Sequence, residues 1–247
     1  TALTMNQLAK EAAPYDLNVV SNISVDGDGD IAAYLAKKGA GLDKYAAKME
    51  QISSYETDLT YGKFFEGQRV ELWQIDEELP EQKIDAFALS DVNKALKMQG
   101  KKPLTLKEDQ YLINCNYKGT YSFIDTALKL HPEVTINGQV LHRASDEVMQ
   151  DTFIMTSIGN NDRGTLIVPD KIANGLKKDM NALLIRYKPD VNSNEVLKKM
   201  IPIGLDKTHG YRYAEKNIMY EMYYGTNALM SFLCCYIGII FLLICAA

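Results

Sequence analysis

The stretch ALMSFLCCYIGIIFLLICAA, residues 228–247, contains no charged side chain, and its only polar side chains are Ser231, Tyr236 and three cysteines. An α-helix rises ~1.5 Å per residue, so this stretch covers roughly the 30 Å hydrocarbon core of a bilayer. Such a helix keeps its backbone hydrogen bonds internal in lipid, whereas a buried core helix is normally shorter or amphipathic. We therefore predict a transmembrane helix over residues 226–247, following a folded body over residues 1–225.

A group of tyrosines precedes this span. Amphipathic aromatic rings collect where hydrocarbon meets the lipid headgroups, so these side chains are expected to mark the near membrane interface. The alternative is that some of them pack within the body. The tyrosines are Tyr211, Tyr213, Tyr220, Tyr223 and Tyr224.

Composition limits the function of the body. The formal net charge of −5 lies entirely on the body, where 27 basic residues are scattered among 32 acidic ones, so no nucleic-acid surface is indicated. Of the four cysteines, only Cys115 lies outside the span, which excludes a disulfide within the body. This usage fits a bacterial surface or a reducing compartment better than a disulfide-built secreted module.

Both ends of the body show strand and helix patterns in alternation. Residues 15–23 and 44–61 have strand patterns, and the helix DIAAYLAKKG from Asp30 to Gly39 lies between them, which predicts a β-α-β unit. A second such unit is expected near the end of the body, where NALLIRYK predicts a strand and SNEVLKKMI a helix. A short helix is expected before Pro14. We predict an α+β fold with a mixed sheet, in which an outer unit of residues 14–61 and 180–215 carries a central insertion, residues 62–179.

The insertion contains shorter elements. Strand IDAFAL (84–89) leads to Ser90 as the N-cap of helix DVNKALKMQ, which Gly100 ends. Asn137-Gly138 between two alternating runs predicts a β-hairpin. Four further elements are expected: a strand in LTLKEDQYLINCN (104–116), helix SFIDTALKL (122–130), a second hairpin in FIMTSIGNNDRGTLIVPD (153–170), and helix KIANGLKK starting at Pro169 and Asp170. The segment RVELWQI (69–75) holds the single tryptophan, Trp73.

No catalytic, cofactor or metal site is predicted. The run DGDGD at Asp26 to Asp30 resembles the start of a calcium loop, but Ile31 and Lys37 stand where such a loop needs Gly and Glu. A capped helix start explains these carboxylates better. The three histidines show no zinc-ligand spacing, and no nucleophile, phosphate-loop or dinucleotide motif occurs.

Paired lysines are the remaining candidates for ligand binding. Lys101 and Lys102 precede Pro103 in a predicted turn, where both ammonium groups could grip a phosphate or pyrophosphate. Solvation of the turn is the alternative. The pairs Lys177-Lys178 and Lys198-Lys199 are weaker candidates of the same kind.

Three stretches carry a resemblance to a known family: IDAFALSDVNKALKMQGKKPLTLKEDQYLI (84–113), GTLIVPDKIA (164–173), and YEMYYGTNALMSFLCCYIGIIFLLICAA (220–247). They resemble the large extracytoplasmic domain and following helix of FtsX-like ABC transporter permeases, most of all the bacitracin-export type.

The resemblance implies a permease subunit in the cell membrane, with more helices before Thr1 and after Ala247 and the body outside the cell. A separate ATPase subunit would hydrolyse ATP, a sensor histidine kinase would be a further partner, and the ligand would be a peptide antibiotic or a lipid-linked cell-wall precursor. The family motifs for ATPase coupling lie outside this stretch of chain, so no residue role is carried over.

Two other classes stay open. A tail-anchored membrane protein with a cytosolic binding domain accounts for a single C-terminal span without any family argument. A membrane-tethered enzyme fits less well, because the polar clusters lack mutual spacing. The start at Thr1, the lack of a signal-peptide pattern and the end at Ala247 lead us to expect a piece of a longer protein.

Overall fold

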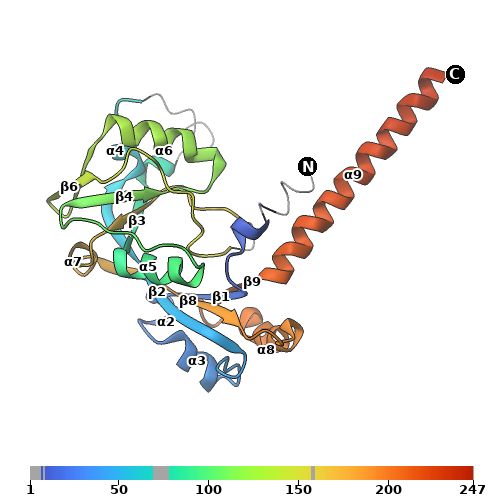
Figure 1. The fold of residues 1–247 in the computed structure, drawn as a ribbon, viewed down its shortest axis with the longest axis horizontal. Coiled ribbons are helices and arrows are strands. Elements are labelled where there is room, and N and C mark those ends of the chain that lie inside the picture. Colours follow the sequence, from blue (N-terminus) through green and yellow to red (C-terminus); the bar gives the residue numbers. More distant parts are fainter. Residues whose placement is uncertain (1–6, 8, 69–77, 157–158, 247) are drawn as a thin grey trace.

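The computed structural model describes residue 7 and residues 9–68, 78–156 and 159–246. A nine-stranded mixed sheet forms the body, in the order β5-β6-β4-β7-β3-β2-β8-β1-β9 (Figure 1). The α+β prediction is confirmed. The strands are β1 (Leu17–Asn22), β2 (Ala46–Thr60), β3 (Lys83–Ala88), β4 (Gln110–Asn114), β5 (Glu133–Ile136), β6 (Gln139–Arg143), β7 (Thr165–Val168), β8 (Lys177–Tyr187) and β9 (Arg212–Glu215).

Helices cover both faces of this sheet. Residues 9–12 are helical, as predicted for the segment before Pro14. The longer helices and the single turns that follow are α2 (Ile23–Asp26), α3 (Ile31–Lys37), α4 (Tyr61–Phe64), η2 (Leu79–Glu81), α5 (Leu89–Met98), α6 (Lys118–Leu130), α7 (Asp170–Ala173), α8 (Ser193–Leu205) and α9 (Lys216–Ala246).

Strands from the two ends of the body lie together in the sheet. β2, β8, β1 and β9 are neighbours, and the strands that come between β2 and β8 in sequence occupy the rest of the sheet. β1 and β2 each pair antiparallel with β8, so they run parallel to one another with β8 between them. The predicted β-α-β unit is therefore present, although its two strands are not direct neighbours.

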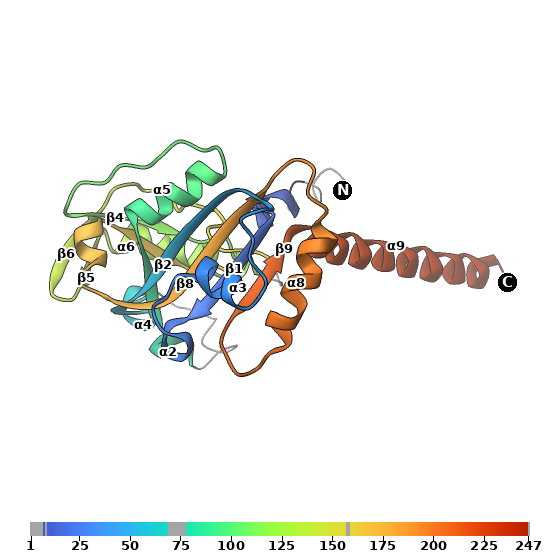
Figure 2. The same ribbon diagram turned by 90° about the horizontal axis from the view of Figure 1, so that it is seen from below.

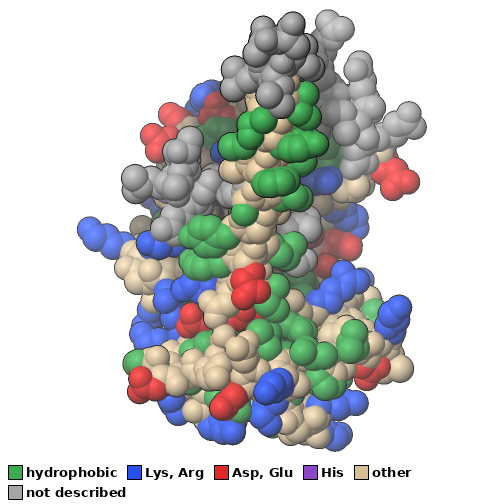
Figure 3. All heavy atoms as spheres, turned by 90° about the vertical axis from the view of Figure 1, so that its right-hand side faces the viewer, with side chains coloured by type: hydrophobic (Ala, Val, Ile, Leu, Met, Phe, Trp, Pro, Cys, Tyr) green, Lys and Arg blue, Asp and Glu red, His purple; other side chains and the backbone are tan. Residues whose placement is uncertain are grey.

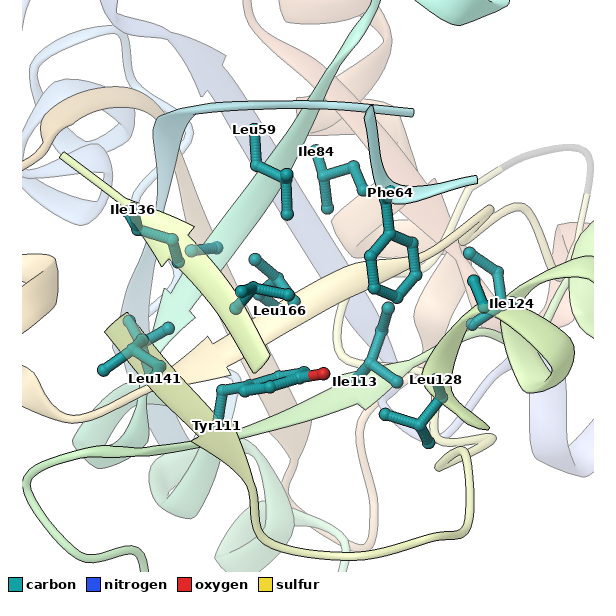
Figure 4. Packing of buried hydrophobic residues seen from close by; sticks show 14 of the residues in the cluster. Leu59, Phe64, Ile84, Tyr111, Ile113, Ile124, Leu128, Ile136, Leu141 and Leu166 are labelled. Carbon is teal, nitrogen blue, oxygen red and sulfur yellow. The ribbon is translucent and has the colours of Figure 1, made fainter. Parts of the chain in front are cut away.

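Two hydrophobic clusters share one face of the sheet. Helices α4 and α6 and the β5-β6 hairpin cover β3, β4 and β7. Phe64, Tyr111 and Ile124 are buried between them (Figure 4). Helices α3 and α8 lie over β1 and β8 (Figure 2). They bury Leu35 and Met200 there. Packing of the helices and the hairpin against this face removes apolar area from water, which is the main favourable term in folding.

A third cluster covers the opposite face and joins both parts of the sheet. It contains Phe87 of β3 and Leu184 of β8, packed against Val92 and Leu96 of α5. Met219, in the first turn of α9, is buried in the same cluster. The long C-terminal helix is thus anchored in the core of the body at its first turns.

The N-cap predicted at Ser90 is wrong. Helix α5 begins at Leu89, directly after β3, and its N-cap residue Ala88 has no side chain that could cap. The carboxylate of Asp170 in α7 accepts a hydrogen bond from the Ser90 backbone N–H at 3.1 Å. β3 and β7 are parallel neighbours, so the helix starts that follow them lie side by side and one supplies the cap of the other.

Three predicted elements are shorter than expected or absent. In the stretch 104–116 only Gln110–Asn114 is a strand. Of the predicted second hairpin, 153–170, only Thr165–Val168 is a strand, and residues 153–156 do not join the sheet. Helix α7 ends at Ala173, because Lys177 and Lys178 already belong to β8. RVELWQI lies outside the described residues.

Other boundaries are confirmed. Asp30 caps α3, Gly39 and Gly100 have positive φ after α3 and α5, and His131 ends α6. Asn137 and Gly138 form the two-residue loop between β5 and β6 with φ of 47° and 77°. Positive φ at both positions is what a type I′ hairpin turn requires.

Helix α9 leaves the body as a single long rod (Figure 1). Within the described residues, Lys216–Phe241 is long and apolar enough to cross a membrane. Figure 3 looks toward this helix and shows mostly hydrophobic side chains along it, whereas Lys, Arg, Asp and Glu side chains are spread over the body around it. Tyr211 lies elsewhere, buried in the body and stacked on Tyr34 at 3.9 Å, so it does not mark the membrane interface.

Candidate functional site

A pocket of about 640 Å³ lies on the same face of the sheet as α5, over a part of that face that α5 does not cover. It is at the end of the sheet where β3, β7, β8 and β9 begin, and the segment after β6 forms its far side. Pockets of this size take small ligands or one or two residues of a peptide. Its lining includes Asn18, Val20, Ser54, Asp85, Phe87, Phe153, Met155, Asp162, Arg163, Thr165, Met180, Arg212 and Tyr213.

The inner wall of the pocket is apolar. Phe87 of β3 and Phe153 meet edge to face with ring centroids 5.8 Å apart, and both are buried. Met180 pairs in register with Ser54, which itself lies opposite Phe87, so the three side chains share one face of the sheet. A hydrocarbon portion of a ligand would lose water against this wall.

Asp85 is the polar group set into this wall. It lies two residues before Phe87 on β3, so both side chains point to the same face. Within the described residues no hydrogen bond to its carboxyl and no ion pair is found, and only burial and other carboxylates act on it. Burial raises its pKa to about 7, and the nearby carboxylates of Asp179, Glu56 and Asp162 act in the same direction.

Asp162 has a structural role. Its carboxylate accepts hydrogen bonds from Asn114 Nδ2 at 2.5 Å, Gly164 N at 2.9 Å and Thr165 Oγ1 at 2.8 Å. Burial raises its pKa although these hydrogen bonds oppose the shift. The side chain fixes the loop before β7, which forms one side of the pocket.

Three basic residues line the opening. Lys83 forms an ion pair with Glu56 at 2.5 Å, and the Arg163 guanidinium lies 5.7 Å from the centre of the Tyr117 ring. Arg212 is exposed at the start of β9. The pocket therefore combines an apolar wall, one unpaired inner carboxyl and cations at its edge.

The lysine pairs singled out in the sequence do not line this pocket. Lys101 forms an ion pair with Asp151 and is half exposed, while Lys102 is exposed beside it. Lys178 pairs with Asp28 at 3.2 Å. These contacts do not test phosphate binding, so the role of the lysine pairs in recognition stays a prediction.

The carboxylates of the DGDGD run point to different partners. Asp30 Oδ1 caps α3 through Ala33 N at 3.0 Å, which confirms the capping prediction. Asp28 accepts from Asn181 at 3.0 Å, and Asp26 accepts from Gly210 N at 2.7 Å. Among the described residues no cluster of three or more His, Cys, Asp or Glu side chains could hold a metal ion.

The sequence analysis missed Asp85, Asp162 and Arg212. Asp85 did carry a signal: it is the one charged residue within the apolar strand run IDAFAL. A charge in such a run is buried on one face of the sheet or the other, and buried charges need a reason. Asp162 lies in the turn of a predicted hairpin, where a carboxylate carries no such signal.

A scan against protein-family models found no match, and a search of curated proteins found none either. Among solved structures the chain resembles a Bacillus anthracis protein described as a lipoprotein, with 8% identity, a TM-score of 0.40, and coverage of 80% of this chain and 96% of that one. It also resembles the periplasmic region of MacB from Actinobacillus actinomycetemcomitans, with 12% identity, a TM-score of 0.38, and coverage of 86% and 94%. At scores this low, neither likeness establishes a shared fold or function.

Proposed function

We propose that this chain is the extracytoplasmic domain and following transmembrane helix of an FtsX-like ABC transporter permease, which senses or grips a ligand at the cell surface. The peptide-antibiotic role of the bacitracin-export type belongs to this proposal, as do the ATPase subunit, the sensor histidine kinase and the multi-pass cell-membrane location. The body itself would carry no catalytic residue.

The observation that carries the proposal is where the chain enters and leaves the body. The first described helical segment, residues 9–12, lies beside the base of α9 (Figure 1). Ala12 and Ala13 share a hydrophobic cluster with Met219, and Lys216 N donates to Asp16 O at 3.0 Å. A body held to the membrane at both ends on one side can pass a hinge motion across the bilayer.

A second link connects the pocket to α9. The segment that forms the far side of the pocket includes Gly159, and the Tyr223 hydroxyl of α9 occupies the space that a Cβ on Gly159 would need. Tyr223 also packs against the cluster that contains Phe153 and Met155. A shift of α9 would therefore move the wall of the pocket, which is what a ligand-responsive transporter domain needs.

Cysteine labelling tests the sidedness. In a background without the four native cysteines, Ser122→Cys, at an exposed position of α6, is treated with a membrane-impermeant maleimide on intact and on permeabilised cells. We expect equal labelling in both, because the body lies outside. Labelling only after permeabilisation would place the body in the cytosol and favour the tail-anchored alternative.

The full reading frame tests the permease class itself. The proposal requires further apolar spans both upstream of Thr1 and downstream of Ala247, and co-purification of the full-length protein with an ATPase subunit. A stop codon directly after Ala247 would contradict it.

The Lys101-Lys102 pair is kept as the candidate for an anionic ligand such as pyrophosphate. Since Lys101 already pairs with Asp151, Lys102 is the better test. If the pair binds the ligand, Lys102→Ala weakens pyrophosphate binding about ten- to hundredfold at low salt, less at physiological salt. Equal affinities at both salt concentrations would remove the pair from recognition.

A further inference from the structure

We propose that the pocket binds a ligand cation, a primary ammonium or guanidinium on an apolar body, with the Asp85 carboxylate as its counter-ion. This inference rests on the proposed function only for the biological role of the ligand. The binding itself is a property of the pocket.

The geometry places an acceptor beside an apolar wall. Asp85 lines the pocket on the same face of β3 as Phe87, and Phe153 and Met180 complete that wall. A half-buried carboxyl without a described hydrogen bond has open acceptor positions. A ligand N–H donor would fill them, and its hydrocarbon part would cover the two phenyl rings.

One basic residue of the pocket lining, Lys83, is already engaged. Lys83 lies two residues before Asp85, on the same face of β3, but it pairs with Glu56 on β2. Arg212 on β9 is exposed at the opening, and Arg163 lies against Tyr117. Neither forms a described ion pair with Asp85.

The groups that face Asp85 are mostly acidic. Asp179 comes from β8, Glu56 from β2 and Asp162 from the loop before β7, and all three raise the pKa of Asp85. The Tyr61 hydroxyl nearby is buried and donates to Gly164 O at 3.1 Å. This arrangement disfavours a lone carboxylate and favours one that is paired with an incoming cation.

Binding of a cation is therefore linked to release of a proton. At a pH below the pKa of about 7, most Asp85 side chains are neutral and must ionise before they pair. Affinity for a cation then falls up to about tenfold per pH unit below the pKa. A neutral ligand of the same shape would not show this dependence.

The test uses the whole chain in detergent micelles and three probes of one shape: 2-phenylethylammonium, 2-phenylethanol and 3-phenylpropionate. Calorimetric titration of the wild type at about pH 8 is expected to give binding of the ammonium at least tenfold tighter than of the alcohol. The same titration at about pH 6 should weaken the ammonium about tenfold and leave the alcohol unchanged.

Asp85→Asn is the matched variant, and Asp125→Asn on α6, whose carboxylate pairs with Lys129 at 2.7 Å, is its control. We expect Asp85→Asn to bind the ammonium at least tenfold more weakly and to lose the pH dependence, with thermal unfolding checking that it is folded. Asp125→Asn should match the wild type.

Four results would overturn the inference: no binding of the ammonium at millimolar concentration, equal affinity for ammonium and alcohol, tighter binding of the carboxylate, or unchanged binding by Asp85→Asn. None of them bears on the labelling of Ser122→Cys. Conversely, a cytosolic body would contradict the proposed function while leaving cation binding intact.

Discussion

Three asparagine side chains form the main-chain hydrogen bonds that a neighbouring β-strand would otherwise form. Each binds both the main-chain N–H and the C=O of one residue in an irregular segment, as a neighbouring strand would. The pairs are Asn18 with Met155, Asn93 with Leu104, and Asn114 with Asp151. This explains why two stretches with strand patterns stay outside the sheet.

Asn18→Ala should destabilise the protein. Asn18 is buried, and its removal leaves the N–H and C=O of Met155 without partners. Each unpaired buried group costs about 1–3 kcal/mol, so urea unfolding followed by circular dichroism should show a loss of at least that size. Asn194→Ala, at an exposed position of α8, is the control and should change little.

Asp85 should make stability fall as pH rises. Its pKa of about 7 in the folded state lies above the ordinary value of 3.8, so between about pH 4 and 7 the folded state holds a proton that the unfolded state has lost. Stability from this group is fully present below about pH 4 and is lost up to pH 7, at up to about 1.4 kcal/mol per pH unit.

Asp85→Asn removes this dependence, because the amide does not titrate. The variant should be more stable than the wild type at about pH 8 and similar to it at about pH 4. Thermal unfolding at both pH values measures the difference. If the variant is less stable than the wild type at both pH values, the Asp85 carboxyl is not an unpaired buried group.

At the scale of elements, the start of α5 depends on a residue 80 positions away. Asp170→Ala should lower stability by about 0.5–2 kcal/mol, because the Ser90 N–H loses its acceptor. Ser90→Ala, which removes the cap expected from sequence, should cost much less. Denaturant midpoints of the two variants compare them, and a larger effect of Ser90→Ala would restore the sequence-based prediction.

The contact between Gly159 and α9 should be sensitive to a single methyl group. Gly159 has φ of +85° and faces the Tyr223 hydroxyl, so Gly159→Ala meets both backbone strain and a steric clash. A loss of about 1–3 kcal/mol is expected by thermal unfolding.

Gly29→Ala is the matched control, since nothing lies within 4 Å of its Cβ position. Adding Tyr223→Phe to Gly159→Ala removes the hydroxyl that clashes but keeps the ring in its cluster and keeps the strained φ, so it should restore only part of the lost stability. If Gly159→Ala leaves stability unchanged, the segment around Gly159 and helix α9 are not in contact.

For the whole molecule, the two parts of α9 should be separable. The described side chains from Ala228 onward are exposed, whereas Met219 is buried in the body. Ending the chain after Gly225 should leave a folded body that no longer needs detergent.

Ending it after Glu215 should cost about 2–5 kcal/mol, because Met219 and the neighbouring tyrosines leave the cluster. Gel filtration and urea unfolding of the two truncated chains distinguish these outcomes. Equal stability would show that α9 contributes nothing to the body.

The sequence by itself determined the apolar span, the α+β class, most helix and strand positions and the Asn137-Gly138 turn. These features follow from local patterns, because periodicity and turn chemistry act over a few residues. Only the tertiary structure decided what depends on distant partners. Examples are the insertion of β8 between β1 and β2, the cap that Asp170 provides for α5, and the hydrogen bonds of Asn18 with Met155. Each of them joins residues far apart in sequence. The pocket belongs to this second kind: Asp85 and Phe153 lie far apart along the chain, and the raised pKa of Asp85 exists only once the fold has buried it.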